Sequence, residues 1–323
     1  MSFASAQALV ADDLAAVEQL ILQRIGSLYA PLTEALENLV RSGGKRVRPT
    51  VALLAARFYP PPSRQALLCL AAAIEALHTA TLIHDDVIDG ALLRRGQSTL
   101  NAVWTPASTV MAGNYFFARA AALAAETGHP RVIRLFAETL NTIVDGELRQ
   151  AFAVRDWGQP KARYYERIYG KTAALFEVAT RSPAVLGDAP PEAEEALRRY
   201  GYHLGMAFQI VDDILDFTAD EKTLGKPAGS DLAAGIITLP VYYYLQDPAQ
   251  RDRLVALAEG TRSGAAVIAE MVRLIRESEA IAQARAEAES FARQAIADLA
   301  LFPPSPHRQA LVDMAEYVVA RPL

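Results

Sequence analysis

Apolar residues recur along this chain with a helical period, and short clusters of proline and glycine interrupt that pattern. Segments rich in Ala, Leu, Glu and Arg lie between breaks at residues 59–63, 127–130, 187–191 and 302–306. Alternating apolar and polar runs do not stand out, and β-branched residues are scattered among strong helix formers. The pattern predicts an all-α protein, a single large helical bundle without a solenoid-like repeat.

Length and composition limit the number of domains and the possible partners. With 323 residues, 52% of them hydrophobic, the chain can bury the core of one large domain or at most two, and we expect a single domain over residues 1–323. The net charge of -5 leaves no global basic field for nucleic acid. Any anion that the chain binds must therefore meet local groups of Lys and Arg.

The cysteine content and the apolar runs bear on location. The single cysteine, Cys69, lies in the apolar run 66–70, which predicts a buried thiol and a reducing, cytoplasmic setting. The apolar stretch 66–83 is interrupted by Glu75 and His78, and residues 1–10 lack a basic region followed by a long apolar core. We therefore expect neither a signal peptide nor stable membrane insertion.

Two acidic clusters carry the main chemical signal. Residues 85–89 read Asp-Asp-Val-Ile-Asp, residues 212–216 read Asp-Asp-Ile-Leu-Asp, and each cluster ends an apolar helical run. In each cluster the first and last aspartates share one helix face, where their repulsion costs free energy unless a cation relieves it. Hard oxygen ligands favour Mg²⁺, which is commonly shared with substrate phosphates. One such cluster could be a solvated helix end, but two matched clusters indicate a phosphorylated substrate.

Basic residues occur where a phosphorylated substrate needs them. They stand beside glycines or just after the first acidic cluster: Lys45, Arg46 and Arg48 within residues 43–49, then Arg94, Arg95, Lys171 and Lys226. Taken singly, each is more often a surface charge. Residues 170–172 (Gly-Lys-Thr) do not form a P-loop, because Tyr165 occupies the place of its upstream glycine.

The pair Glu75 and His78 also matches half of a carboxylate di-iron site on a bundle helix. The other Glu-x-x-His pair, Glu126 and His129, falls at the glycine and proline break of residues 127–130 and not within a helical run, so the second helical half of such a site is missing. His78 fits better as a donor to an anionic substrate than as an iron ligand, and the alternative is an ordinary helix-face histidine.

In this order, and over nearly the whole chain, the sequence resembles the trans-isoprenyl (polyprenyl) diphosphate synthases, especially the medium- to long-chain members. Residues 43–49 resemble the family's GGKRxRP segment, residues 85–89 and 208–216 its two aspartate-rich motifs, and residues 170–172 its GKT segment. Residues 225–227, Asp231 and residues 238–240 also match. The resemblance implies an isoprenoid-synthase bundle with a central apolar cavity and a homodimeric prenyltransferase. Its partners would be isopentenyl diphosphate and an allylic diphosphate.

The resemblance also implies a role for each matching residue. Three magnesium ions, with diphosphate bound, would be held by Asp85, Asp89 and Asp212, supported by Asp86, Asp213, Asp216 and Asp231. The allylic diphosphate would be bound by Arg94, Lys171 and Lys226, and isopentenyl diphosphate by Lys45, Arg48, His78 and Arg95. Thr172 and Gln209 would lie near the developing cation.

Two positions depart from the family pattern. The segment that commonly reads G-K-x-T is Gly-Ile-Ile-Thr at residues 235–238, so Ile236 replaces a lysine that often helps to bind the allylic diphosphate. Asn114 stands where an aspartate is usual.

Small residues before the first acidic cluster indicate a long product. Ala80 and Thr81 lie about one helical turn before Asp85, along the path that a growing tail must take. Short-chain members often carry an aromatic floor there, so we predict a product of twenty carbons or more and favour a long chain. Leu77 and Ile74, with residues around 140–144, are candidates for a deeper floor.

Two alternative functions use related chemistry. A class I terpene cyclase also ionises a diphosphate with magnesium, but its second metal motif mixes Asn or Asp with Ser and Glu. A non-catalytic subunit of a heteromeric synthase tends to lose one aspartate cluster, whereas this chain has both. We therefore favour a catalytic synthase.

Overall fold

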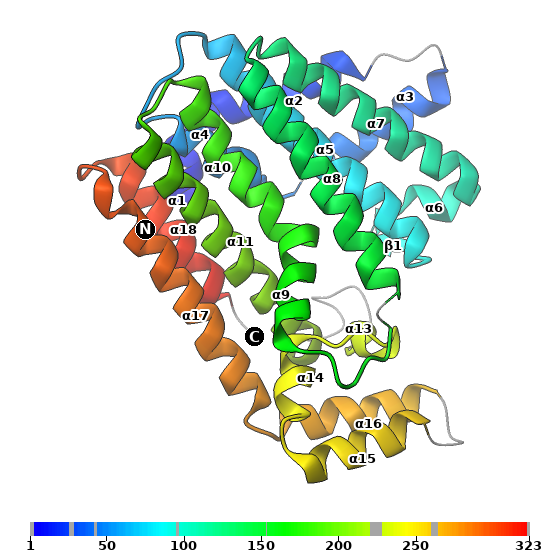
Figure 1. The fold of residues 1–323 in the computed structure, drawn as a ribbon. Coiled ribbons are helices and arrows are strands. Elements are labelled where there is room, and N and C mark those ends of the chain that lie inside the picture. Colours follow the sequence, from blue (N-terminus) through cyan, green and yellow to red (C-terminus); the bar gives the residue numbers. More distant parts are fainter. Residues whose placement is uncertain are drawn as a thin grey trace. The chain divides into compact units, whose positions relative to one another are not determined.

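The computed structural model describes residues 3–25, 29–41, 44–94, 97–152, 154–219, 228–259 and 264–321. Within these ranges helices dominate, and the two strands, β1 (Leu93–Arg94) and β2 (Gln97–Ser98), form a short antiparallel pair (Figure 1). The all-α prediction is confirmed.

The described chain forms two compact units, each assembled from segments that are distant in sequence. The first unit comprises residues 1–140, 175–201 and 298–314, and the second comprises residues 141–174, 202–297 and 315–323. Three long helices, α8 (Pro130–Phe152), α11 (Pro191–Thr218) and α18 (Pro306–Ala320), contribute to both units. The single domain over residues 1–323 stays a prediction.

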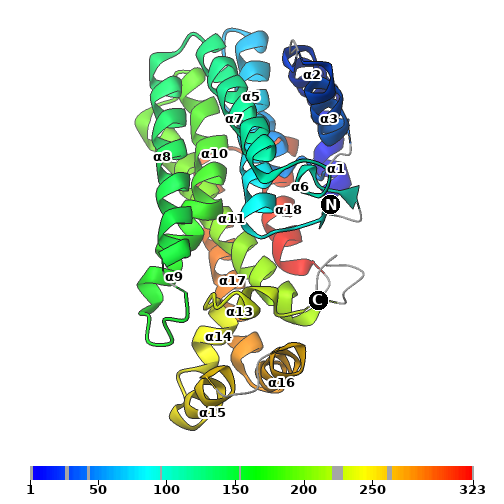
Figure 2. The same cartoon turned by 90° about the vertical axis from the view of Figure 1, so that its right-hand side faces the viewer.

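The first unit is built around one long buried helix. Its elements are α1 (Phe3–Ala8), α2 (Ala11–Arg24), α3 (Ala30–Arg41), α4 (Val47–Ala55), α5 (Arg64–Ile88), α6 (Leu100–Val103), α7 (Pro106–Glu126), α10 (Ala174–Leu186) and η2 (Leu299–Leu301). The Ser63 hydroxyl caps α5 by accepting from the Ala66 N–H at 3.2 Å. Helix α7 packs along α5 (Figure 2), and Gly113 allows this approach, because a Cβ there would lie 2.3 Å from His84 Nε2.

Helix α5 is also the one described helix with the length and apolar character of a membrane span. Its most apolar window has a mean hydropathy of 1.8, and 83% of that window is buried inside the structure. Cys69 is buried in this helix, as predicted. The burial is what the central helix of a helical core requires.

The second unit positions the second aspartate cluster. Its own elements are α9 (Lys161–Ile168), η1 (Tyr169–Ala173), α13 (Ser230–Ala233), α14 (Leu239–Tyr244), α15 (Pro248–Glu259), α16 (Ala265–Arg276) and α17 (Ala280–Asp298). Helices α15 and α16 lie side by side (Figure 1). Their apolar residues Leu254 and Ile275 bury against Phe217 near the end of α11, so this core anchors the helix that carries Asp212–Asp216.

Candidate functional site

The first aspartate cluster occupies the last turn of α5. Asp86 is buried and accepts a hydrogen bond from Arg94 Nε at 2.7 Å. Burial raises the pKa of the Asp86 carboxyl, although Arg94 acts to lower it. Asp85 is half-buried, and Asp89 is exposed at the end of the helix. Asp86 therefore orients Arg94, and Asp85 and Asp89 remain as the pair that shares a helix face.

The three basic residues around the start of α4 lie in different environments, Lys45 and Arg46 just before the helix and Arg48 in its first turn. Arg48 is buried, with its guanidinium 4.7 Å from the centre of the Phe176 ring. Lys45 is exposed. Arg46 has a left-handed backbone with φ of 47° and donates to Glu75 Oε1 at 2.7 Å and to the Val40 carbonyl. Arg46 is thus a structural group, whereas the substrate-binding roles of Lys45 and Arg48 stay predictions.

The contact with Arg46 also accounts for Glu75, which the sequence places three residues before His78. The Glu75 carboxylate is 7% exposed and is neutralised by the guanidinium, so its burial needs no metal ion. His78 is half-buried one turn further along α5. The di-iron interpretation therefore gains nothing from the structure.

The tail-length candidates lie on the same helix. Ala80 and Leu77 are fully buried, and Thr81 is half-buried with its hydroxyl donating to the His78 carbonyl at 2.7 Å. Their role in product length stays a prediction.

The second aspartate cluster lies near the end of α11, and its members have distinct partners. Asp212 accepts from Arg321 Nη1 at 2.7 Å, and the same guanidinium lies 4.3 Å from the centre of the Phe208 ring. Asp216 is buried and accepts from Ser230 Oγ at 2.7 Å and from the Asp231 N–H at 3.2 Å. Asp216 therefore fixes the short helix that carries Asp231, while Asp212 remains at the half-exposed edge of the cluster.

Asp213 lies at the centre of a buried hydrogen-bond chain. Tyr164 donates to Asp213 Oδ2 at 2.9 Å, and Gln209 Nε2 donates to Asp213 Oδ1 at 2.7 Å. Thr172 in turn donates to Gln209 Oε1 at 2.5 Å. Burial raises the pKa of the Asp213 carboxyl to about 7; the Asp231 carboxylate adds to this rise, and Arg167 opposes it.

The Gly-Lys-Thr segment is part of a π-helical turn, η1, which the sequence did not predict. Here Gly170 contacts Gly146 of α8 so closely that a Cβ on Gly146 would lie 3.0 Å from the Gly170 Cα atom. The approach sets Lys171 Nζ 3.7 Å from Glu147 Oε1. The glycine pair thus determines where Lys171 and Thr172 stand relative to α8.

We expect Gly146→Ala to lower the free energy of unfolding by about 1–2 kcal/mol, because overpacking against backbone costs more than alanine gains in helix propensity. Thermal unfolding followed by circular dichroism measures the change. Gly158→Ala is the control, since its Cβ would come no closer than 3.9 Å to Asp156 Oδ1. A melting temperature at or above that of the wild type would contradict this account of the glycine pair.

Two of the predicted substrate ligands, Lys226 and Arg95, lie outside the described residues, as do Gly43 and residues 225–227. Sequence reasoning in turn missed Tyr164 and Arg321. Neither residue lies in a recognisable motif, and their partners Asp213 and Asp212 are 49 and 109 positions away. A tyrosine next to Tyr165 and an arginine near the C-terminus carry no local signal of these contacts.

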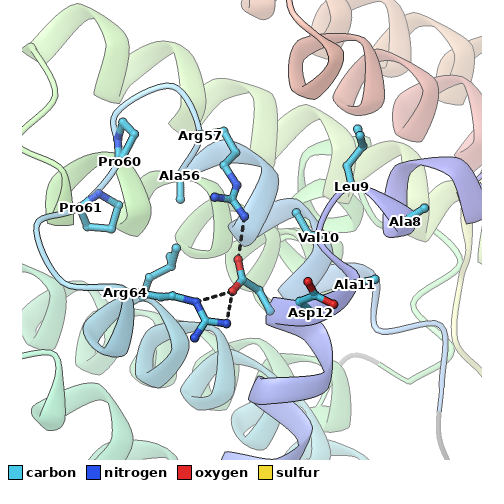
Figure 3. Close-up of a pocket in the computed structure, with 12 residues that line it drawn as sticks. Ala8, Leu9, Val10, Ala11, Asp12, Ala56, Arg57, Pro60, Pro61 and Arg64 are labelled. Atoms are coloured by element: carbon cyan, nitrogen blue, oxygen red, sulfur yellow. Dashed lines mark hydrogen bonds and ion pairs between the residues drawn. The ribbon is translucent and has the colours of Figure 1, made fainter.

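A cavity of about 390 Å³ lies in the first unit (Figure 3). It is lined by α1, α2 and the α4–α5 connection, and Arg57 and Arg64 meet the buried Asp13 beside it at 2.7 Å each. None of the predicted site residues lines this cavity. Because Arg57 and Arg64 are paired with Asp13, we do not assign this cavity as the site of substrate binding.

The donor set suits a hard divalent cation that is shared with a substrate. Over the described part of the chain, no three His, Cys, Asp or Glu side chains are grouped as a protein-only metal cage. A magnesium ion bound at Asp85 and Asp89, or at Asp212, would therefore complete its shell with water and phosphate oxygens. The described fold is all-α, and a diphosphate site at these groups stays a prediction.

Comparison with known proteins identifies the family. Residues 30–275 match the polyprenyl synthetase family. The chain is 39% identical over 312 residues to heptaprenyl diphosphate synthase component 2 of Geobacillus stearothermophilus, and 36% identical over 314 residues to octaprenyl diphosphate synthase of Escherichia coli, covering 97% of each chain in both cases. Its fold is similar to the crystal structure of polyprenyl synthase from Caulobacter crescentus complexed with calcium and isoprenyl diphosphate. That similarity has a TM-score of 0.94 and 37% identity, and covers 99% of this chain and 98% of the other.

The chain belongs to the polyprenyl synthetase family, and it is a prenyltransferase. The predicted resemblance, the isoprenoid-synthase fold and the enzyme class are confirmed. These similarities do not favour the terpene cyclase or the non-catalytic subunit.

Proposed function

We propose that this protein is a magnesium-dependent trans-polyprenyl diphosphate synthase that joins isopentenyl diphosphate to an allylic diphosphate and makes a long-chain product. One observation carries the proposal: two matched aspartate clusters each lie near the end of a long helix, and basic side chains stand close to both in the sequence. The Caulobacter crescentus relative, complexed with calcium and isoprenyl diphosphate, supports the choice of metal and ligand.

The acidic residues divide into ligands and supports. Asp85, Asp89 and Asp212 bind the magnesium ions, of which we propose three. Asp86 holds Arg94 at 2.7 Å, and Asp216 holds the turn that carries Asp231. Bound magnesium neutralises the negative charge that grows on the leaving diphosphate.

The basic residues bind the two substrates. Arg94, Lys171 and Lys226 bind the allylic diphosphate, while Lys45, Arg48, His78 and Arg95 bind isopentenyl diphosphate. Because Ile236 stands in place of a lysine, the allylic site depends more strongly on Lys171 and Lys226 than in relatives that have this lysine.

The reaction needs no covalent nucleophile from the protein. Cleavage of the allylic C–O bond leaves a carbocation, the double bond of isopentenyl diphosphate attacks it, and loss of a proton to the departed diphosphate restores the alkene. Water would quench the cation, so the apolar surroundings of α5 must exclude it. Thr172 and Gln209 lie near the cation.

Product length follows from the size of the side chains along α5. Ala80 and Thr81 leave room for a tail longer than fifteen carbons, and Leu77 and Ile74 contribute to a deeper floor. The heptaprenyl and octaprenyl names of relatives support a long product. We further propose that the enzyme works as a homodimer in the cytoplasm, without stable insertion into membranes.

A radiochemical assay tests the proposal. Purified chain is incubated with labelled isopentenyl diphosphate and with C5, C10, C15 or C20 allylic primers, and chromatography gives the product length. We expect products of twenty carbons or more in Mg²⁺ and none in excess EDTA. A hydrocarbon made without isopentenyl diphosphate would indicate a cyclase, and no elongation with any primer would indicate a non-catalytic subunit.

A further inference from the structure

The hydrogen-bond chain through Asp213 is buried along most of its length. Tyr164 is fully buried, and Asp213 and Thr172 are 3% and 5% exposed. The ring of Tyr164 lies 5.3 Å from the guanidinium carbon of Arg167, which donates to the Ile237 carbonyl at 2.9 Å. Two anchored elements, α9 and α11, therefore hold the two ends of the Tyr164–Asp213 contact in place.

The donor and acceptor groups allow these hydrogen bonds to run in one direction only. When it is ionised, the Asp213 carboxylate can only accept, so it takes the Tyr164 O–H on one oxygen and requires the Gln209 amide to present its NH₂ group to the other. The Gln209 carbonyl oxygen then faces Thr172, whose single hydroxyl proton is donated to it at 2.5 Å. The opposite amide orientation would set a carbonyl oxygen against a carboxylate.

This direction matters for a reaction that creates positive charge. A hydroxyl presents either its proton or its lone pairs to a neighbour, and only the lone pairs stabilise a carbocation. Because the Thr172 proton is used within the chain, its lone pairs are the part of the hydroxyl left to face substrate. No reorientation is then needed when the allylic C–O bond breaks.

We propose that Tyr164 and Asp213 are positioning residues that fix the direction of this chain and so make Thr172 present lone pairs to the allylic cation. The inference rests on the proposed prenyl transfer and deepens it. Tyr164 acts through Asp213 and Gln209 and touches neither substrate.

Tyr164→Phe is the direct test, because it removes the hydroxyl and keeps the ring beside Arg167. We expect kcat to fall about 10–100-fold with KM for both substrates little changed, while the melting temperature falls modestly because a buried Asp213 oxygen loses its donor. Tyr165→Phe is the matched control on the same helix, since its ring packs 5.9 Å from Phe291. Its kcat should equal that of the wild type.

A double-mutant cycle with Thr172→Val separates positioning from general structural support. If Tyr164 acts through Thr172, adding Tyr164→Phe to Thr172→Val costs no further activity, whereas independent effects would multiply. Asp213→Asn, which no longer dictates the amide orientation, should lower kcat in the same way, and Thr172→Ser should restore most of the loss seen with valine. Multiplying losses, or a loss confined to KM, would overturn the inference. Lack of elongation by the wild type would instead mean that the proposed function has failed.

Discussion

Asp85→Ala lowers kcat/KM for the allylic diphosphate by about 10³-fold, because a lost metal ligand removes several kcal/mol of transition-state stabilisation. Asp85 shares a face of α5 with Asp89, and its neighbour Asp86 is already engaged with Arg94 at 2.7 Å. No adjacent carboxylate on that helix can therefore take its place. Steady-state assays over a range of Mg²⁺ concentrations measure the effect, and added Mg²⁺ should restore part of the activity.

The matched control is Glu37→Ala. Glu37 is a partly exposed acid in the same unit, 3.8 Å from Arg41, and surface pairs of this kind contribute little to stability. Its kcat/KM should match that of the wild type. If Asp85→Ala kept more than a tenth of the wild-type value, the first cluster would not be the metal site.

Ala80→Tyr shortens the product to about twenty carbons or fewer, because the phenol ring closes the tail path roughly 7.5 Å along the helix axis from Asp85. Ala80 is fully buried on α5, so the added ring must occupy interior space. Reversed-phase chromatography of labelled products shows the change directly. The rate of the first condensation should fall much less than the product length.

Two further variants make this prediction selective. Thr81→Phe, at a half-buried position, should shorten the product with less crowding of the core. Ala256→Tyr, on the exposed surface of α15, should leave the product distribution unchanged. An unchanged distribution in Ala80→Tyr would mean that the tail does not pass this face of α5.

The elements predicted best from sequence were those that local rules determine. The helical period of the apolar residues, together with the breaks at proline and glycine, was enough to predict the all-α fold class. The i, i+4 spacing placed Asp85 with Asp89 and Asp212 with Asp216 at helix ends. Cys69 is buried, as its apolar sequence neighbours in residues 66–70 predict. Each of these inferences needed only residues within a few turns of one another.

The contacts that decide individual roles were not predictable in this way. Arg46 looked like a substrate ligand, yet it pairs with Glu75, 29 positions away. Arg321 meets Asp212 across 109 positions. The π-helical turn at residues 169–173 depends on the close approach of Gly146 to Gly170, and tertiary packing rather than local propensity sets such an approach.

The central claim is that both aspartate clusters bind magnesium that carries the allylic diphosphate. Calorimetric titration with a farnesyl thiodiphosphate, which ionises too slowly to react, tests it without turnover. The wild type should bind this analogue tightly in Mg²⁺ and at least about 100-fold more weakly in EDTA. Asp85→Ala and Asp212→Ala should each lose most of the gain in affinity that Mg²⁺ gives the wild type. Metal-independent binding, or wild-type affinity in either variant, would contradict the account.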